Sequence, residues 1–311
     1  MRRLTSLLFV LLGFAGMFTA GAAEAAPYFA PTGSMTVARS APASAPLPNG
    51  GALVAGGISG GGIVNTAEVF NPASGTFSST GSMVDSRVSA AASQLPDGKI
   101  LVAGGVGDVP FPQSGYLAQT EIYDPSTESF SAYTPMPEPR ARMAAASLAD
   151  GRVMLFGGDG VGGVDLDSTV ILDPATGVWS AGPSMPEVMV DPVASALPDG
   201  TVLVAGGSSP TRVLIYDPES ETFAYGGYLF EGRTAASAAP LADGGVLIVG
   251  GFGDDLYKAS AEVFNFSTGT FAPTASMPQE RANPEAIPVA GGRVLVAGGN
   301  DSSVTWSSAL L

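Results

Sequence analysis

The 311-residue sequence contains no cysteine and no histidine. Without cysteine there are no disulfides and no thiolate-bound zinc, and without histidine there are no imidazole ligands for a metal. Nucleophile pairs of the Ser–His or Cys–His kind are excluded for the same reason. We therefore predict neither a metal site nor a cofactor, although the lack of cysteine does not fix the compartment.

Basic residues are also scarce, because 13 Lys and Arg stand against 28 Asp and Glu, for a formal charge of −15. Nucleic acids and anionic membranes attract proteins through basic patches, so we predict neither as a partner. Beyond the N-terminus no apolar run is long enough to span a bilayer, so we expect no membrane insertion. A hydrophobic content of 45% is nevertheless sufficient for a core.

The first 25 residues have the layout of a secretory signal peptide: a basic start, an apolar stretch over residues 4–18 and small residues over 20–26. Ala23–Ala25 fits the small-x-small rule, so we predict cleavage after Ala25. A retained anchor is the alternative, which the short apolar run disfavours. We expect an exported protein, secreted, periplasmic or at the cell surface. Loss of two arginines and one glutamate makes the mature charge −15 − 2 + 1 = −16.

One pattern recurs through the rest of the chain: a turn, a short apolar run and a pair of glycines. Residues 95–105 are the clearest copy, and the pairs begin at intervals of 48, 53, 49, 44 and 48 residues. The first glycines of the pairs are Gly56, Gly104, Gly157, Gly206, Gly250 and Gly298. Such a period indicates a repeat architecture, here one domain over residues 26–311.

The second repeat predicts four short strands, at residues 87–94, 99–103, 120–123 and 129–132, which we name a to d. Asp97-Gly98 forms the a–b turn and Asp124-Pro125 the c–d turn. The apolar b strand indicates burial on both faces. An aromatic residue follows each c–d turn, and we interpret these aromatics as core. They are Phe77, Phe130, Trp179, Phe223 and Phe271.

A glycine pair after an apolar strand, an Asp-Pro turn and a closing aromatic together resemble the kelch repeat, over about residues 29–311. The resemblance implies an all-β, six-bladed kelch-type β-propeller with four antiparallel strands per blade. The last repeat ends where strand c is expected, while residues 29–35 match the d-strand spacing of residues 77–83. We therefore predict that Pro27–Met35 completes the last blade by pairing near Ser303–Leu311.

Seventeen residues before each glycine pair stands an arginine, except in the fourth repeat, which has Met189. The five are Arg39, Arg87, Arg140, Arg233 and Arg281. Each falls between strands d and a, at the same end of the blades as the b–c loops. One interpretation is structural, with pairing to loop carbonyls or carboxylates. The other is a positive ring that binds a carboxylate-bearing glycan or peptide. The carboxylates available are Glu68, Glu121 and Glu262.

Departures from the repeat are the better ligand-binding candidates. Two positions after the arginine the residues are small in three repeats but Arg142, Asp191 and Asn283 in the others, with Glu285 two positions further on. These residues form either a ligand site or a solvated rim at the channel mouth.

The longest b–c loop, Val106–Gln119, contains Phe111 and Tyr116, which serve recognition or pack on their own blade. The loop over residues 159–167 carries three aspartates, which would permit Ca²⁺, but it lacks an EF-hand frame, so we predict no metal there.

Two functions fit these residues. The first is a secreted, non-catalytic binding or scaffold protein, monomeric, which recognises a protein or glycan through its loop face. The alternative, which the resemblance keeps open, is a carbohydrate-active enzyme of the sialic-acid epimerase (mutarotase) type, with Arg142, Asp191 and Glu285 in acid–base roles. A copper-radical sugar oxidase is excluded because it needs histidine and cysteine. A surface adhesion element is a third possibility, and whether the protein is an enzyme stays open.

Overall fold

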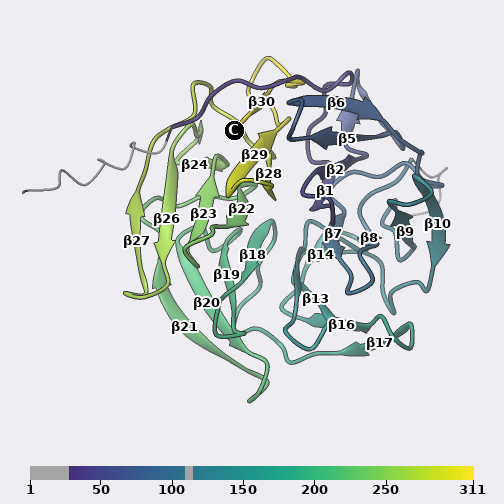
Figure 1. Ribbon diagram of the computed structural model, residues 1–311. Helices are drawn as coiled ribbons and strands as arrows, with labels where there is room; N and C mark the ends of the chain where they lie inside the picture. Colours follow the sequence, from purple (N-terminus) through teal and green to yellow (C-terminus); the bar gives the residue numbers. More distant parts are fainter. Residues whose placement is uncertain (1–27, 109–114) are drawn as a thin grey trace, which may run out of the picture.

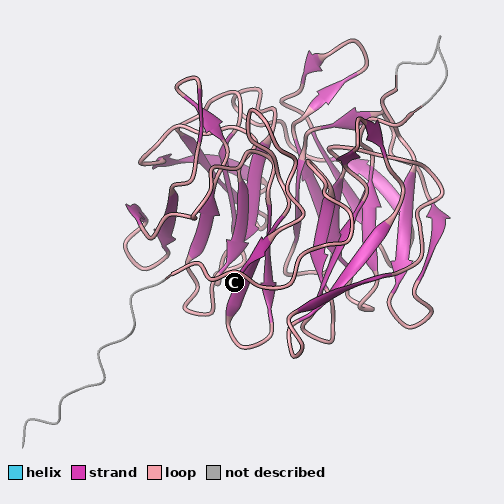
Figure 2. Cartoon of the chain, turned by 90° about the horizontal axis from the view of Figure 1, so that it is seen from above, coloured by secondary structure: helices cyan, strands magenta, loops and turns pink. Residues whose placement is uncertain are grey.

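The computed structural model describes residues 28–108 and 115–311, which form strands and loops without a helix. The predicted signal peptide, residues 1–25, lies outside the described residues, as does Phe111. The strands surround a central axis (Figure 1) and run between two faces that carry the loops (Figure 2). Within the described ranges, no helix has the length and hydropathy to cross a bilayer.

Five sheets contain four antiparallel strands each, in chain order from the centre outwards. The first has β1 (Ala43–Pro46), β2 (Ala52–Ala55), β5 (Ala67–Asn71) and β6 (Thr76–Ser79). The second has β7 (Ala91–Gln94), β8 (Ile100–Ala103), β9 (Thr120–Asp124) and β10 (Ser129–Tyr133). The third has β12 (Ala144–Ser147), β13 (Val153–Phe156), β16 (Thr169–Asp173) and β17 (Val178–Ala181). The all-β architecture of four-stranded antiparallel sheets predicted from the repeats is thus present.

The remaining strands complete this arrangement. The fourth sheet has β18 (Pro192–Ala196), β19 (Val202–Gly206), β20 (Arg212–Asp217) and β21 (Thr222–Tyr228). The fifth has β22 (Ser237–Pro240), β23 (Val246–Val249), β26 (Ala261–Asn265) and β27 (Thr270–Pro273). The sixth has β28 (Glu285–Val289), β29 (Arg293–Ala297) and β30 (Ala309–Leu310). Short strands in the loops are β3 (Ile58–Ser59), β4 (Gly62–Ile63), β11 (Arg140–Ala141), β14 (Asp159–Gly160), β15 (Val164–Asp165), β24 (Phe252–Gly253) and β25 (Leu256–Tyr257).

The N-terminal segment completes the sixth sheet, as its spacing predicts. Ala30 and Leu311 exchange both backbone hydrogen bonds at 2.8 Å, and the N–H of Met35 donates to the carbonyl of Ser307 at 2.8 Å. Pro31 lies opposite Leu310 at the non-hydrogen-bonded position in between, where no N–H is needed, and the N–H of Thr32 donates to the carbonyl of Ala309 at 3.0 Å. The first and last described segments of the chain therefore close the ring together.

Apolar residues are buried between neighbouring sheets all around the ring. Most residues of the b strands are inaccessible on both faces: Ile100–Ala103 and Val153–Phe156 are 0% exposed, whereas β29 begins with the exposed Arg293. Six apolar clusters occupy the spaces between adjacent blades, including one shared by the sixth and first sheets through Ile287 and Val54. The inner strands are rich in alanine and serine, so their side chains leave a narrow channel along the axis.

The glycine pairs allow each blade to touch the next. Gly104 has a φ of +61°, and a Cβ on it would lie 2.3 Å from the carbonyl oxygen of Arg140 in the following blade. The N–H of Gly105 donates to that same carbonyl at 2.9 Å. A side chain on Gly104 would push the next blade away, and a Cβ on Gly105 would lie 2.7 Å from the carbonyl oxygen of Val88 in its own blade, which explains why the pair recurs.

Deleting residues 26–36 should lower the melting temperature by about 10 °C or more, since it removes the pairing with residues 307–311 and the buried Met35 side chain. Calorimetry of the truncated chain measures the change. A chain that begins at residue 28 is the matched control, because it keeps the closing segment. Equal melting temperatures for the two chains would contradict closure by this segment.

Candidate functional site

The d–a connections and the b–c loops lie on one face of the disc, as the connectivity predicts. Each d–a connection pairs with the b–c loop of its own blade: Ser40 with Ile58, Val88 with Val106, and Thr234 with Phe252. β11 and β14 form the same pairing in the third blade. This face therefore brings the repeated arginines, their departures and the variable loops together.

The five repeated arginines have a structural role, because at most 1% of each residue is exposed to solvent. In the second blade, Nη1 of Arg87 donates to the carbonyls of Gly104 at 2.9 Å and Gln119 at 3.0 Å, and Nη2 pairs with Glu121 at 2.5 Å. Each guanidinium fastens the end of strand b to the start of strand c in this way. The equivalent contacts lie at Arg39, Arg140, Arg233 and Arg281.

This burial corrects the expectation of a positive ring that a ligand could touch. The charges face carbonyls and carboxylates inside the blades, which supports the structural interpretation. Desolvation lowers the pKa of Arg281 to about 10, and no acidic side chain is among its hydrogen-bond partners in the described residues. Arg39, Arg87 and Arg233 instead pair with Glu68, Glu121 and Glu262.

A glutamate accompanies the arginine only in blades where a backbone N–H needs it. Glu121 accepts the N–H of Val84 at 2.7 Å, and Glu68 and Glu262 do the same for the residue three before their arginines. In the other three blades the residue at the position of Val84 is proline, which has no N–H, and an apolar residue stands at the position of the glutamate. The prolines are Pro137, Pro186 and Pro278, and the apolar residues are Val170, Leu214 and Leu310.

The departures from the repeat meet at the mouth of the channel. The residues two after each arginine, or after Met189, all have a left-handed backbone with φ between +49° and +56°, which turns the chain from the d–a connection into the inner strand. They are Ala41, Ser89, Arg142, Asp191, Ala235 and Asn283. All six line a cavity of about 190 Å³, together with Ser44 and Glu285. We call this cavity the channel mouth.

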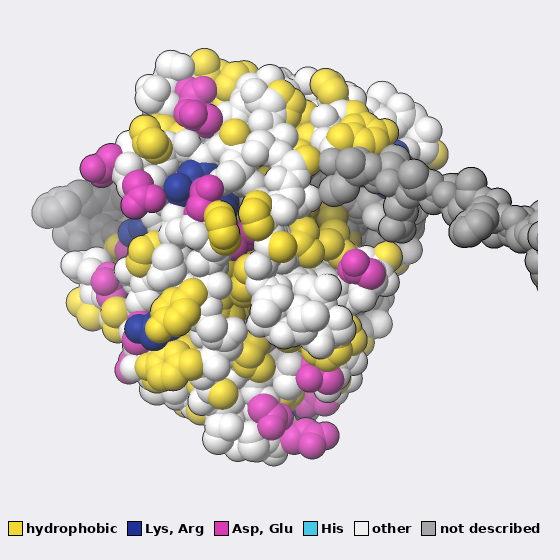
Figure 3. All heavy atoms as spheres, turned by 90° about the vertical axis from the view of Figure 1, so that its left-hand side faces the viewer, with side chains coloured by type: hydrophobic (Ala, Val, Ile, Leu, Met, Phe, Trp, Pro, Cys, Tyr) yellow, Lys and Arg dark blue, Asp and Glu magenta, His cyan; other side chains and the backbone are white. Residues whose placement is uncertain are grey.

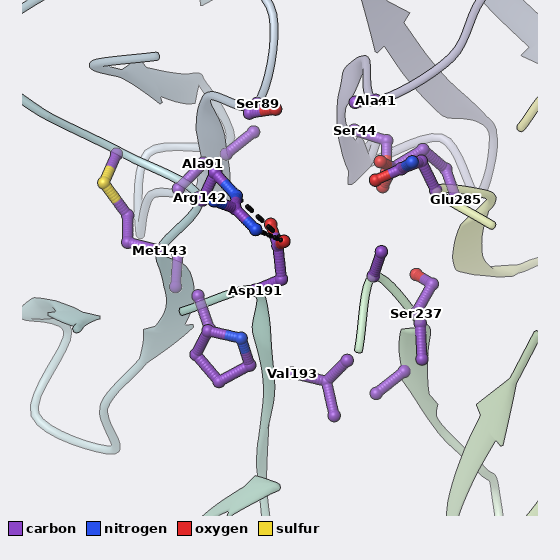
Figure 4. Close-up of a pocket in the computed structure, with 18 of the residues that line it drawn as sticks. Ala41, Ser44, Ser89, Ala91, Arg142, Met143, Asp191, Val193, Ser237 and Glu285 are labelled. Atoms are coloured by element: carbon purple, nitrogen blue, oxygen red, sulfur yellow. Dashed lines mark hydrogen bonds and ion pairs between the residues drawn. The ribbon is translucent and has the colours of Figure 1, made fainter. Parts of the chain in front are cut away.

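Arg142 and Asp191 form an ion pair on one wall of the channel mouth (Figure 4). Nε of Arg142 donates to Oδ2 of Asp191 at 2.9 Å, and Nη1 lies 3.5 Å from Oδ2 of Asp159. Tyr116 donates its hydroxyl to that Asp159 oxygen at 3.0 Å, so three blades contribute to one network. Desolvation raises the pKa of Asp191 despite the guanidinium, whereas Asp191 raises the pKa of Arg142.

Glu285 lies on the other wall of the channel mouth. The equivalent residues of the other five blades are alanine, valine or serine. The only hydrogen-bond partner of Glu285 among the described side chains is Ser44, whose hydroxyl donates to Oε2 at 2.6 Å. Burial raises the pKa of Glu285 to about 8, so the group is an uncharged acid at neutral pH. The sequence analysis did not single out Ser44, although the equivalent residue is alanine in each of the other five repeats.

The other predicted site residues lie at the edge of the channel mouth or outside it. Asn283 donates its amide to Asn300 at 3.3 Å, at the edge of the mouth. Tyr116 is half-buried against the next blade rather than projecting from its loop. Among the described residues, no group of three or more Asp and Glu is arranged to hold a metal ion. The aspartates of the 159–167 loop are instead divided, with Asp159 engaged by Arg142 and Tyr116.

Comparisons with known proteins agree with this fold. The sequence profile of the Kelch motif matches residues 140–186. A solved structure described as "Structure of YjhT" superposes with a TM-score of 0.72 and 15% sequence identity, covering 89% of this chain and 94% of that one. No curated protein matches the sequence. The kelch motif in the third blade and the likeness in fold to this solved structure support the kelch-type β-propeller fold predicted from the repeats.

The glutamate–proline alternation predicts opposite effects of one substitution in two backgrounds. Glu121→Val should destabilise the protein by roughly 3–5 kcal/mol, because it leaves the Val84 and Asp85 N–H groups without an acceptor and the buried Arg87 without its carboxylate. Val84→Pro should restore part of that loss, since it removes the orphaned donor, but should destabilise the wild type. Urea denaturation of the four proteins gives the coupling. A destabilising effect of Val84→Pro in both backgrounds would contradict this account.

Proposed function

We propose that the protein is an exported, non-catalytic binding protein that holds a protein or glycan ligand at the channel mouth. The observation that carries this proposal is the convergence of Arg142, Asp191, Asn283 and Glu285. Each departs from a repeat of small residues, and all four line one cavity. Residues that only maintain the propeller would repeat, as the buried arginines do.

The charges at the channel mouth favour a neutral or cationic ligand group over a carboxylate. Arg142 already faces Asp191 and Asp159, so the three groups together carry about one negative charge. Asp159 does not line the cavity itself but adds a carboxylate behind Arg142. This revises the expectation of a ligand carboxylate at Arg142: sugar hydroxyls or peptide N–H groups suit the site better.

The export part of the proposal rests on the N-terminal sequence alone. A basic start, an apolar stretch and Ala23–Ala25 support removal of residues 1–25. Mass spectrometry of the natural protein tests it, with a chain beginning at Ala26 as the expected product. An intact N-terminus in a cytosolic fraction would contradict export.

Arg142→Ala should weaken ligand binding by roughly 1–3 kcal/mol while changing stability by less than about 1 kcal/mol, because the Arg142 side chain is 43% exposed. The purified chain from residue 26 is screened on a glycan and peptide array, and the strongest hit is titrated calorimetrically. Arg152→Ala is the matched control, since Arg152 pairs with Asp150 at 2.6 Å on the opposite face.

Unchanged affinity in Arg142→Ala, or an equal loss in Arg152→Ala, would place the ligand elsewhere. Unfolding of Arg142→Ala would show instead that the Arg142–Asp191 pair belongs to the framework.

Glu285 supports a second candidate, a carbohydrate-active enzyme of the epimerase or mutarotase type. An acid with a pKa of about 8 faces a cavity whose other wall holds an aspartate and an arginine. Perturbed acids in clefts are candidates for general acid–base work. Polarimetry of sugar anomers with the wild type and Glu285→Gln tests this candidate, and acceleration that the variant loses would favour it over simple binding.

Glu285 should also make stability depend on pH. The folded-state pKa of about 8 exceeds the unfolded value of about 4.3, so the folded chain binds the extra proton between these values. The contribution of Glu285 is therefore most favourable below about pH 4 and is lost as the pH rises through 8. Glu285→Gln should match the wild type at pH 4 and melt higher at pH 9. If the melting temperatures of the two proteins changed with pH in the same way, Glu285 would not have the raised pKa.

A further inference from the structure

The exposed aromatic residues of the protein are concentrated in one short segment. Apart from Tyr28, the aromatic side chains that are exposed in the described residues are Tyr225, Tyr228 and Phe230, at 62%, 63% and 66%. They lie on and just after β21, the outer strand of the fourth blade. We call these three residues, with Arg212 and Glu187, the rim patch; none of them lines the channel mouth.

The three aromatics are departures from the repeat. Counted from the closing aromatic of strand d, the fourth repeat has Tyr225, Tyr228 and Phe230 where the other five repeats have no aromatic residue. At the Tyr225 position they have Pro31, Ser79, Ala132, Ala181 and Pro273. At the Tyr228 position they have Ser34, Ser82, Pro135, Ser184 and Ser276. At the Phe230 position they have Thr36, Val84, Pro137, Pro186 and Pro278. The framework of the blade therefore does not require these rings.

A β-bulge places the two tyrosines on the same side of the sheet. Residues three apart on a regular strand face opposite sides, but the register of β20 and β21 shifts so that Tyr225 lies opposite Leu214 and Tyr228 opposite Arg212. Gly226 is the extra residue, and a Cβ on it would lie 2.8 Å from Ile215. Gly227 has a φ of +104°. The backbone is thus shaped to present both rings together.

Arg212 fixes the two rings. Its guanidinium carbon lies 4.9 Å from the ring centre of Tyr225 and 5.4 Å from that of Tyr228. Nε pairs with Glu187 at 3.0 Å, so the patch is close to neutral. Figure 3, which views the left-hand side of Figure 1, shows hydrophobic side chains gathered next to dark-blue basic ones. The patch combines rigid apolar faces with hydroxyl, guanidinium and carboxylate groups at their edges.

We propose that the rim patch is a second binding site, for uncharged sugar rings of a glycan. The ring faces suit the flat C–H face of a pyranose, and the polar groups at their edges suit its hydroxyls. Three side chains that bury about 150–250 Å² each fall short of the roughly 800 Å² per partner of a stable protein interface. The neutral Arg212–Glu187 pair and the charge of −15 oppose an anionic sugar.

The test titrates the chain from residue 26 with soluble neutral hexasaccharides, namely β-1,4-glucan, β-1,4-mannan, β-1,4-xylan, α-1,4-glucan and chitin oligomers, with oligogalacturonate as the anionic comparison. At least one neutral oligomer should bind, and Tyr225→Ala combined with Tyr228→Ala should weaken it about tenfold or more. Tyr225→Phe with Tyr228→Phe keeps the rings and should retain affinity within about threefold. Leu256→Ala, which removes an exposed side chain from another blade, is the matched control.

Four outcomes would overturn the proposal: no binding of any neutral oligomer, binding of the galacturonate alone, unchanged affinity in the double alanine variant, or self-association that this variant abolishes in place of sugar binding. Arg142→Ala separates the two sites. Loss of oligomer binding in that variant, with the tyrosines dispensable, would assign the sugar to the channel mouth and remove the rim patch from consideration.

Discussion

The structure depends on a buried guanidinium that joins two loops of the same blade. An arginine side chain reaches the glycine carbonyl at the end of strand b and a second carbonyl just before strand c, so it closes the longest and most variable connection of the repeat from within. Because the fastening lies beneath the surface, the loop beyond it is free to change length. The b–c loops can therefore differ between blades while the strands that they connect remain in register.

The fourth blade shows how this charge can be dispensed with. Met189 and Leu214 occupy the places of the arginine and glutamate and join the apolar cluster shared with the third blade. Replacing both members of a buried pair by apolar residues is often tolerated, whereas losing one partner leaves an uncompensated group. Proline three residues earlier removes the N–H that the glutamate would serve. In this blade the residues at the positions of the arginine, of the glutamate and of the N–H donor all differ together. The role of each residue therefore becomes clear only when the repeats are compared.

Much of the fold is predictable from the sequence because its determinants are local and repeated. Asp-Gly turns, apolar runs and glycine pairs set the strands, and the matching spacing of residues 29–35 and 77–83 revealed the closing segment. The arginines were predicted at the correct face. Whether they make structural contacts or touch a ligand depends on their burial, which a repeat pattern cannot show. Arg142, Asp191 and Glu285 stood out as departures, whereas the Arg142–Asp191 pairing and the Ser44–Glu285 bond depend on which blades face each other across the channel.

The pairing of Ala30 with Leu311 has a consequence for how the chain reaches this state. Contacts across nearly the whole sequence carry the largest loop-closure entropy, so they form late in folding and raise the contact order. Until residues near 311 are available, the earlier blades form an open arc whose terminal sheet edge is uncovered. During synthesis such an edge is exposed to pairing with other chains, until the strand that closes the ring covers it.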